Sequence, residues 1–225
     1  MKKFSSAFLG LALAALVAIP LSGIWSSSAA DTKTQAAKVS YLPIPAGDYS
    51  IDPMHTTIGF AIRHLEINWV NGLFHEFKGT VKYDAADVTR STVEFTAKIE
   101  SIDTGVTPRN NHLKTADFFD AAKFPDMTFK STKVERKGKD GYLLTGDFTL
   151  KGVTKSISFP FAITGAVKDP WGNTRFGIDA HTKINRRDYG INYGNALAIG
   201  GFDVGNEVTI NLQLEVLQPG PAPAK

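Results

Sequence analysis

The chain contains no cysteine among its 225 residues. Disulfides and thiolate metal ligands are therefore excluded, and so is the lipid-modified cysteine that tethers a bacterial lipoprotein. The stability of the fold must come instead from burial of apolar side chains and from a closed ladder of backbone hydrogen bonds.

A strong net charge is also missing. The formal net charge is +3, and Lys2 and Lys3 supply two of those charges. Without its first residues the chain is close to neutral, whereas a nucleic-acid-binding protein needs a concentrated basic surface. We expect no nucleic-acid partner.

Local signatures of catalysis are absent as well. The sequence has no Gly-x-Ser-x-Gly elbow, no phosphate-binding glycine loop and no dinucleotide fingerprint. No two histidines have the His-x-x-x-His spacing, and thiolates are lacking, so we expect no metal site and no cofactor. We predict that the protein is not an enzyme, although a site assembled from distant residues is the alternative. The histidines are His55, His64, His75, His112 and His181.

The N-terminal segment has the three parts of a secretory signal. Two lysines precede an apolar stretch at residues 8–21, and the small residues Ser28-Ala29-Ala30 follow it. We predict a signal peptide over residues 1–30, cleaved before Asp31. The alternative, a membrane anchor, is disfavoured because a spanning helix needs about 20 apolar residues. No later segment approaches such a span, so we expect no transmembrane anchor after cleavage.

Residues 31–47 read as a flexible leader and residues 218–225 as a disordered Pro/Ala tail. Between them, apolar and polar residues alternate with a period of two, which indicates strands with one buried face. Short turn signals separate about eight such strands. The clearest cover residues 57–64, 92–100, 155–164 and 207–217, and weaker ones cover 74–83, 127–134, 142–150 and 175–184. Pro160 marks an edge or a bend in its strand.

A sheet of this kind must pack on a second sheet or close on itself, and closure removes its exposed edges. We predict an all-β fold, an eight-stranded antiparallel barrel, which is just wide enough for one slim ligand. Two segments interrupt the alternation. Residues 64–72 are expected to form a short helical turn, and residues 108–119 a short helix over one mouth, acting as a plug or as a ligand gate. The 15 phenylalanines imply a large apolar interior, filled or hollow.

Six segments carry a resemblance to a known family. They are residues 55–64 (HTTIGFAIRH), 72–79 (GLFHEFKG), 101–105 (SIDTG) with Arg109, His112, Leu113 and 117–120 (DFFD), 125–131 (PDMTFKS), 146–155 (GDFTLKGVTK) and 184–190 (INRRDYG). In this order and over nearly all of residues 48–217, the chain resembles the YceI-like proteins. The resemblance implies a lipocalin-like barrel domain in the periplasm. It also implies a tunnel for a polyisoprenoid, such as a prenyl pyrophosphate or an isoprenoid quinone, and pairing into homodimers.

Candidate ligand contacts follow from the chemistry of such a lipid. Apolar walls suit its tail, and arginine forks or histidine donors suit a phosphate or quinone headgroup. The alternative for the charged residues is structural ion pairing, of Arg186 with Asp188 and of Arg109 with Asp103. Which strand face lines the tunnel stays open. The candidates are Phe60, Ile62, Phe95, Leu113, Phe118 and Phe119 for the tail, and His55, Arg109, His112, Arg186 and Asp188 near the headgroup.

The leading hypothesis is therefore a periplasmic carrier of a long-chain apolar lipid. One alternative is an enzyme that acts on a lipid headgroup. Another is a stress-response interaction protein whose core is filled by its own side chains. The sequence does not identify the lipid, its chain length or its destination.

Overall fold

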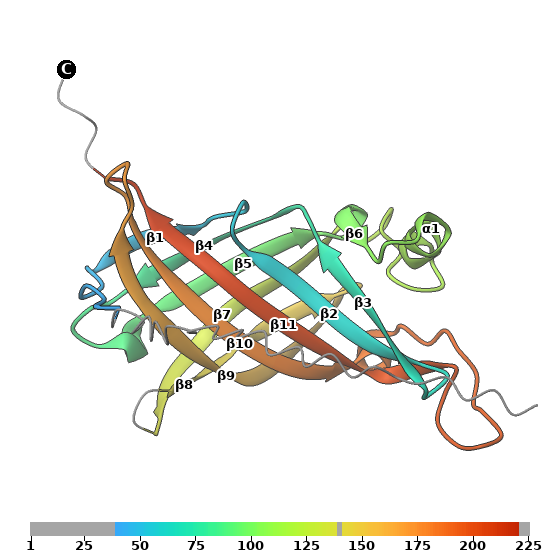
Figure 1. The fold of residues 1–225 in the computed structure, drawn as a ribbon. Helices are drawn as coiled ribbons and strands as arrows, with labels where there is room; N and C mark the ends of the chain where they lie inside the picture. Colours follow the sequence, from blue (N-terminus) through green and yellow to red (C-terminus); the bar gives the residue numbers. More distant parts are fainter. Residues whose placement is uncertain (1–38, 139–140, 221–225) are drawn as a thin grey trace, which may run out of the picture. The chain divides into compact units, whose positions relative to one another are not determined.

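The computed structural model describes residues 39–138 and 141–220. The predicted signal peptide, most of the predicted leader and the end of the tail lie outside these residues. The described chain forms one sheet of eleven strands, one short α-helix and three 3₁₀ turns (Figure 1). In the described ranges, no helix combines the length and the apolarity required to cross a membrane.

The elements follow one another along the chain as strands joined by short connections. They are β1 (Gly47–Ile51), β2 (Thr57–His64), β3 (Asn68–Phe74), β4 (Phe77–Tyr83), η1 (Val88–Arg90), β5 (Thr92–Lys98), η2 (Ile99–Ser101), β6 (Ile102–Asp103), α1 (Thr107–Lys114), β7 (Asp126–Lys137), β8 (Gly141–Leu150), β9 (Val153–Lys168), β10 (Thr174–Asn185), η3 (Arg186–Tyr189) and β11 (Val204–Gln218).

The sheet closes on itself. Strand β1 pairs with β4 on one side and with β11 on the other, and every strand pair is antiparallel. The ring runs β1-β4-β5-β7-β8-β9-β10-β11 and returns to β1, so the predicted eight-stranded antiparallel barrel is confirmed. Closure pairs the strand edges that an open sheet would leave exposed.

Two further strands lengthen the barrel at one end. Strands β1 and β2 both pair with β11, β1 at Val216 and Leu217 and β2 farther along β11, from Gln213 to Val204. They are successive pieces of one long strand, separated by a bend at residues 52–56. In the same way, β3 pairs with β2 and β4 pairs with β1, so β3 and β4 also follow one another along one line. Strand β6 extends this part of the sheet by pairing with β3.

The barrel has two different ends. At one end lie α1, the 65–67 turn between β2 and β3, the β8–β9 turn and the 186–203 segment between β10 and β11; we call this end the α1 mouth (Figure 1). The far end holds the connections at 84–91 and 169–173. Part of the far end is solidly packed, since Tyr49, Ala166, Phe176 and Val216 are at most 2% exposed.

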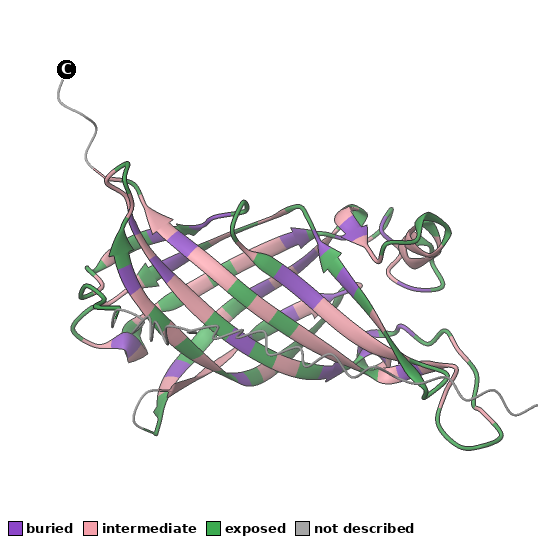
Figure 2. Cartoon of the chain, viewed as in Figure 1, coloured by how far each residue is buried: buried purple, intermediate pink, exposed green. Residues whose placement is uncertain are grey.

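Buried and exposed residues alternate along the strands, as the period of two predicts (Figure 2). Strand β2 has the predicted bounds, and the other predicted strands are present with bounds that differ by a few residues. Pro160 lies where β9 separates from β10, because β9 pairs with β8 from Val153 onward but with β10 only from Phe161. The predicted edge or bend at this proline is confirmed.

The predicted helical turn at residues 64–72 is wrong. Residues 65–67 form a tight turn, and the residues after it form strand β3. Leu65 and Glu66 adopt left-handed conformations, with φ of 51° and 60°. Turns of this kind usually carry Asn or Gly at such positions. The pair Asn71-Gly72, which would usually mark such a turn, lies inside β3 instead. The sequence therefore offers its turn signal at a different place from the turn itself.

The predicted helix at residues 108–119 is shorter than expected. Helix α1 ends at Lys114, because Thr115 is extended and its N–H returns to the carbonyl of His112 at 3.1 Å. A series of turns follows, and it places Phe118 in the barrel core. The segment lies at the α1 mouth, as predicted (Figure 1).

Candidate functional site

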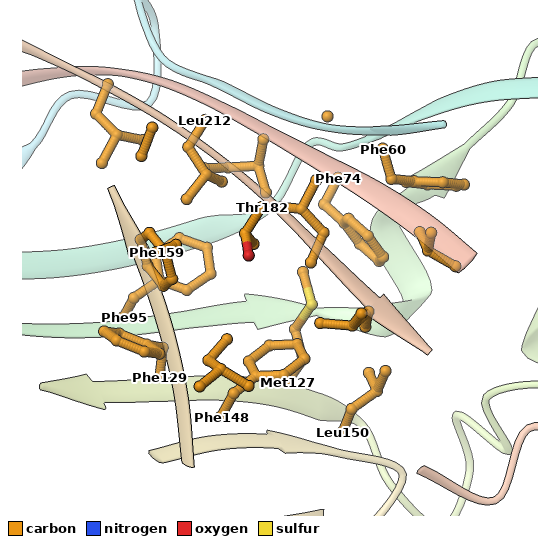
Figure 3. Close-up of a pocket in the computed structure, with 18 of the residues that line it drawn as sticks. Phe60, Phe74, Phe95, Met127, Phe129, Phe148, Leu150, Phe159, Thr182 and Leu212 are labelled. Carbon is orange, nitrogen blue, oxygen red and sulfur yellow. The ribbon is translucent and has the colours of Figure 1, made fainter. Parts of the chain in front are cut away.

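A cavity of about 380 Å³ runs inside the barrel. Its walls are the inward faces of the strands, and its size lies within the range of roughly 300–1,000 Å³ found for small-molecule sites. Figure 3 shows side chains from several strands pointing into one common space, among them Phe60, Phe95, Met127 and Phe159. The apolar residues at every second position of β9 and β11 line this cavity, so the apolar faces of these two strands point inward.

The interior is hollow rather than filled. Inward-facing residues such as Phe60, Phe95, Phe161 and Leu212 line the cavity yet remain only partly buried. In a filled core these side chains would lose nearly all of their accessible surface. The cavity therefore leaves apolar surface available for contact with an apolar guest.

The middle of the cavity is almost free of polar groups. Among the side chains drawn in Figure 3, Thr182 on β10 contributes an oxygen and Met127 a sulfur. Such a wall offers dispersion contact without demanding hydrogen-bond partners. It is suited to a hydrocarbon chain.

The cavity becomes cationic at the α1 mouth. Arg63 and His64 from β2, Arg109 and His112 from α1, and Arg186 from η3 all belong to its lining. Among the described residues that line the cavity there is no aspartate or glutamate. This end therefore favours a guest group that is anionic or accepts hydrogen bonds.

Arg186 is almost fully buried, with 3% of its surface exposed. Its guanidinium donates to the carbonyl oxygens of Gly205 (2.7 Å), Ile191 (2.7 Å) and Val204 (2.8 Å). Burial, and then the nearby Arg187, lower the pKa of Arg186. Arginine nevertheless keeps its charge at neutral pH. Most of its donors are thus engaged in holding the segment between β10 and β11.

The alternative of an ion pair between Arg186 and Asp188 is wrong. Asp188 is exposed, lies outside the cavity lining and makes no salt bridge in the described chain. The carbonyl groups take its place as partners of Arg186 because η3 turns the chain back over the guanidinium. Asp188 therefore does not reach the cavity.

Arg109 has more donors available. Its Nε donates to Thr104 Oγ1 and its Nη2 to the Thr104 carbonyl, both at 2.8 Å. The ion pair proposed from the sequence, with Asp103, is also wrong: Asp103 accepts from Asn110 and from the Gly105 N–H. Arg109 is partly exposed and lines the cavity, so the rest of its guanidinium can meet a guest.

An aromatic cluster covers the cavity beside α1. The ring centroids of His112 and Phe118 are 5.0 Å apart, and Tyr193 lies within 4.9 Å of both. Asp117 Oδ2 is 2.9 Å from His112 Nε2 and fixes the orientation of the imidazole. These three rings line the cavity and also close part of its mouth, which fits both the plug and the gate.

His55 does not lie at the cavity. It sits on the bend between β1 and β2, its Nδ1 is 2.8 Å from Asp52 Oδ2, and neither residue belongs to the cavity lining. Arg175 joins the same cluster through Asp52, Glu215 and Asp169. Asp52, His55 and Glu215 are close enough together to hold a metal ion, but the Arg175 guanidinium already supplies the positive charge between the two carboxylates.

Of the candidate ligand contacts predicted from the sequence, all except His55 and Asp188 line the cavity. The structure adds several that the sequence did not single out. Thr104 and Tyr193 belong to connecting segments, whose placement no periodicity predicts. The added residues include Arg63, His64, Thr104, Met127, Phe129, Leu144, Phe148, Phe159, Phe161, Thr182, Tyr193 and Leu212.

The fold and the cavity define a class: a closed antiparallel barrel that holds one apolar site in its interior. Within that class the chain belongs to the YceI-like family, since residues 49–216 match the model of the YceI-like domain.

Relatives and solved structures agree with this assignment. The chain is 40% identical to protein YceI of Escherichia coli O6:H1 over 148 residues, which are 65% of this chain and 77% of the relative. The crystal structure of the Campylobacter jejuni YCEI protein is similar, with 30% identity, a TM-score of 0.61 and coverage of 69% of this chain and 89% of that one. A polyisoprenoid binding domain from Saccharophagus degradans shares the fold at 15% identity and a TM-score of 0.56, covering 77% and 98% of the two chains.

Proposed function

We propose that the protein is a binding protein that encloses the tail of a long-chain polyisoprenoid lipid in its barrel, in the periplasm after export. The observation that carries the proposal is the hollow, carboxylate-free cavity of about 380 Å³. The polyisoprenoid binding domain of Saccharophagus degradans, which has the same fold, supports the choice of lipid.

The walls match the energetics of such a tail. Removing a hydrocarbon chain from water gains about 0.8 kcal/mol for each buried CH₂ group. The partly buried side chains of Phe60, Phe95, Phe161 and Leu212 are also removed from water when a tail covers them. Part of this gain is lost in ordering the chain, so several isoprene units are needed for tight binding.

The headgroup is proposed to lie at the α1 mouth. Arg109 lines the cavity there and has donors that Thr104 does not use, and a guanidinium fork suits phosphate oxygens. His112 lines the cavity on the same helix; its Nε2–H donates to Asp117, and in the imidazolium form its Nδ1–H can donate to a quinone carbonyl as well. A prenyl pyrophosphate and an isoprenoid quinone are thus both compatible with this end, and the three arginines of the lining favour the anionic one.

We propose binding without turnover. The described lining contains no carboxylate to act as a general base. His64 and His112 also line the cavity and could act as a base instead, but in the described chain neither imidazole has a serine, threonine or tyrosine hydroxyl as a hydrogen-bond partner to activate. Pairing into homodimers, which the resemblance implies, remains a separate prediction.

Extraction of the protein from its native compartment, followed by mass spectrometry, tests the proposal. A matched pair of variants sharpens the experiment. Ala180→Phe places a ring in the cavity, since Ala180 is 6% exposed and part of the lining. Ala162→Phe places the same ring on the outer face of the neighbouring strand, where Ala162 is exposed.

Wild type and Ala162→Phe are expected to carry a co-purifying isoprenoid, and Ala180→Phe to have lost it while keeping its folded circular-dichroism spectrum. A wild-type protein that carries no long-chain lipid, and takes up none when isoprenoid is added, would contradict the proposal. Consumption of a prenyl pyrophosphate that stops on Arg109→Ala or His112→Ala would instead favour the enzyme.

A further inference from the structure

Large apolar side chains are exposed at the tips of the α1 mouth. Ile67 in the turn between β2 and β3 is 76% exposed, and Ile199 in the loop before β11 is 82% exposed. Leu65 (37%) and Trp69 (40%) flank Ile67. We call Leu65, Ile67, Trp69 and Ile199 the mouth patch. Exposed apolar residues gathered at one site, unlike scattered ones, mark a contact surface.

The two segments that carry the mouth patch are tied together. The Leu65 N–H donates to the Asp203 carbonyl at 2.8 Å, and the Phe202 N–H donates to Glu66 Oε1 at 3.1 Å. In Figure 1 both segments project past the same end of the barrel. The mouth patch is thus one surface on a fixed support, built from segments far apart in the sequence.

Cations accompany these apolar side chains. The Arg63 guanidinium lies 4.3 Å from the Trp69 ring centroid, and Arg187 lies 4.7 Å from that of Phe202. The carboxylate of Glu66 accepts from the Phe202 N–H, and that of Asp203 accepts from the Asn195 and Val204 N–H groups. These N–H groups orient both carboxylates toward the loops, and in the described chain neither Arg63 nor Arg187 forms a salt bridge, so both arginines are left to meet an external partner.

The mouth patch adjoins the charged end of the cavity. Arg63 and His64 line the cavity immediately before Leu65, and Val204 lines it at the end of the loop that carries Ile199. Tyr193, from the same loop, lines the cavity and is 42% exposed. A partner held on the mouth patch therefore lies next to the place where a headgroup enters or leaves.

We propose that the mouth patch docks the protein on the surface of an anionic lipid bilayer, so that a lipid passes between the membrane and the cavity through the α1 mouth. The proposal rests on the proposed lipid-binding function. A tryptophan with arginine beside it and protruding isoleucines is a composition suited to the membrane interface, where the apolar part enters the acyl boundary and the cation meets headgroups. Cationic lining without carboxylates adds charge complementarity to anionic lipids.

The docking can be tested by tryptophan fluorescence, because each exposed tryptophan can be followed separately. Trp69 lies in the mouth patch, whereas Trp171 is 79% exposed in the far-end turn between β9 and β10. The exported form without the predicted signal peptide has lost Trp25, so two single variants each retain one tryptophan: Trp171→Phe keeps Trp69, and Trp69→Phe keeps Trp171. Brominated phosphatidylcholine in phosphatidylglycerol-containing vesicles is expected to quench Trp69 and to leave Trp171 unquenched.

Vesicle flotation with matched surface variants provides the second readout. Ile67→Ser with Ile199→Ser is expected to weaken binding to phosphatidylglycerol-containing vesicles by about tenfold or more. The control, Met54→Ser with Val167→Ser, removes exposed apolar side chains elsewhere on the barrel and is expected to bind like wild type. All variants are used in the exported form without the predicted signal peptide, because the apolar stretch at residues 8–21 would itself bind vesicles and mask the contribution of the mouth patch.

Equal quenching of both tryptophans, or flotation of the Ile67/Ile199 variant like wild type, would overturn the docking proposal. So would a loss of self-association in that variant without a change in flotation, which would assign the mouth patch to a second copy of the chain. Uptake of isoprenoid from solution without vesicles separates the two proposals. If wild type takes up isoprenoid but binds no vesicles, docking alone fails; if it takes up none, the lipid-binding function fails.

Discussion

The ring of Phe60 occupies the space that a side chain at Gly72 would need. These residues are directly paired on β2 and β3, and a Cβ built on Gly72 would lie 2.3 Å from Phe60 Cζ. Phe60 lines the cavity and also contacts Phe74, at a centroid distance of 5.8 Å. The missing side chain at Gly72 thus lets this ring settle against the wall instead of standing farther into the cavity.

Gly72→Ala is expected to shorten the tail that the cavity accepts. The added methyl must displace the Phe60 ring, and overpacking of this kind costs about 1–3 kcal/mol. Binding of long isoprenoids should fall several-fold, while binding of short ones changes little, as titration with a chain-length series would measure. Gly59→Ala serves as the control, since its Cβ meets ordinary contacts at 3.5 Å. Equal losses for all chain lengths would argue against displacement of the ring.

Thr182→Val is expected to strengthen binding of an isoprenoid tail or leave it unchanged. Thr182 brings a hydroxyl into a wall that is otherwise nearly apolar (Figure 3). A tail that covers this hydroxyl removes it from water, at a cost of about 1–3 kcal/mol when no partner replaces the water. Valine has nearly the same shape and avoids this cost. Calorimetric titration of both proteins measures the difference, and clearly weaker binding by the variant would indicate that the hydroxyl contacts a polar part of the ligand.

The sequence predicted the barrel because the alternation of apolar residues survives in nearly every strand. Along β9, Ile157, Phe159 and Phe161 share a face in the sequence, and all three line the cavity. The pattern alone could not decide between a filled and a hollow interior. That difference arises from how the opposing walls are spaced, a property of the closed ring that no single strand encodes.

The errors lie where backbone geometry overrides the pattern. Leu65 and Glu66 adopt left-handed conformations without the residues that usually signal them, so the sequence predicts a helical turn where the chain forms a tight turn before β3. His55 sits on the bend between β1 and β2, where the alternation stops and the direction of a side chain cannot be read from its neighbours. Arg186 finds carbonyl partners that only the folded segment from Ile191 to Gly205 creates.

Arg186 and Arg109 are expected to respond differently to substitution. Arg186→Met leaves the buried carbonyls of Gly205, Ile191 and Val204 without a donor, which should lower the free energy of unfolding by about 3 kcal/mol or more. Arg109→Gln should cost less than about 1 kcal/mol, since Arg109 is partly exposed.

Binding of a prenyl phosphate should show the opposite order. Arg109→Gln is expected to weaken it about tenfold or more, because a charge-assisted hydrogen bond contributes about 1.5–3 kcal/mol. Binding of the corresponding prenol, which has no phosphate, should be unchanged. Chemical denaturation and ligand titration of both variants supply the measurements. Equal loss of phosphate and prenol binding in Arg109→Gln would remove this arginine from the headgroup site.

Asp52 ties the bend between β1 and β2 to β10 and makes the stability of the barrel sensitive to acid. Burial alone would raise the pKa of Asp52, but hydrogen bonds from His55 and Arg175 outweigh burial and lower it to about 2. The pKa of Asp169 is likewise lowered to about 2 by hydrogen bonds from Arg175 and Asn173, against the effect of burial. Both carboxylates are therefore more acidic in the folded protein than in the unfolded chain.

A carboxyl group whose pKa is lower in the folded than in the unfolded state stabilises the fold. This stabilisation is fully present above the pKa of the unfolded state and is lost as the pH falls through the pKa of the folded state. For Asp52 the window runs from its ordinary value of 3.8 down to about 2. The contribution of Asp52 to the free energy of unfolding at neutral pH is about 2 kcal/mol.

Urea unfolding at a series of pH values should show wild type losing stability through this window. Asp52→Asn should be less stable at neutral pH and lose less on acidification, so the two curves converge as the pH approaches 2. Parallel curves would mean that Asp52 does not carry the acid sensitivity, and that the Arg175 cluster is held together mainly by its other carboxylates.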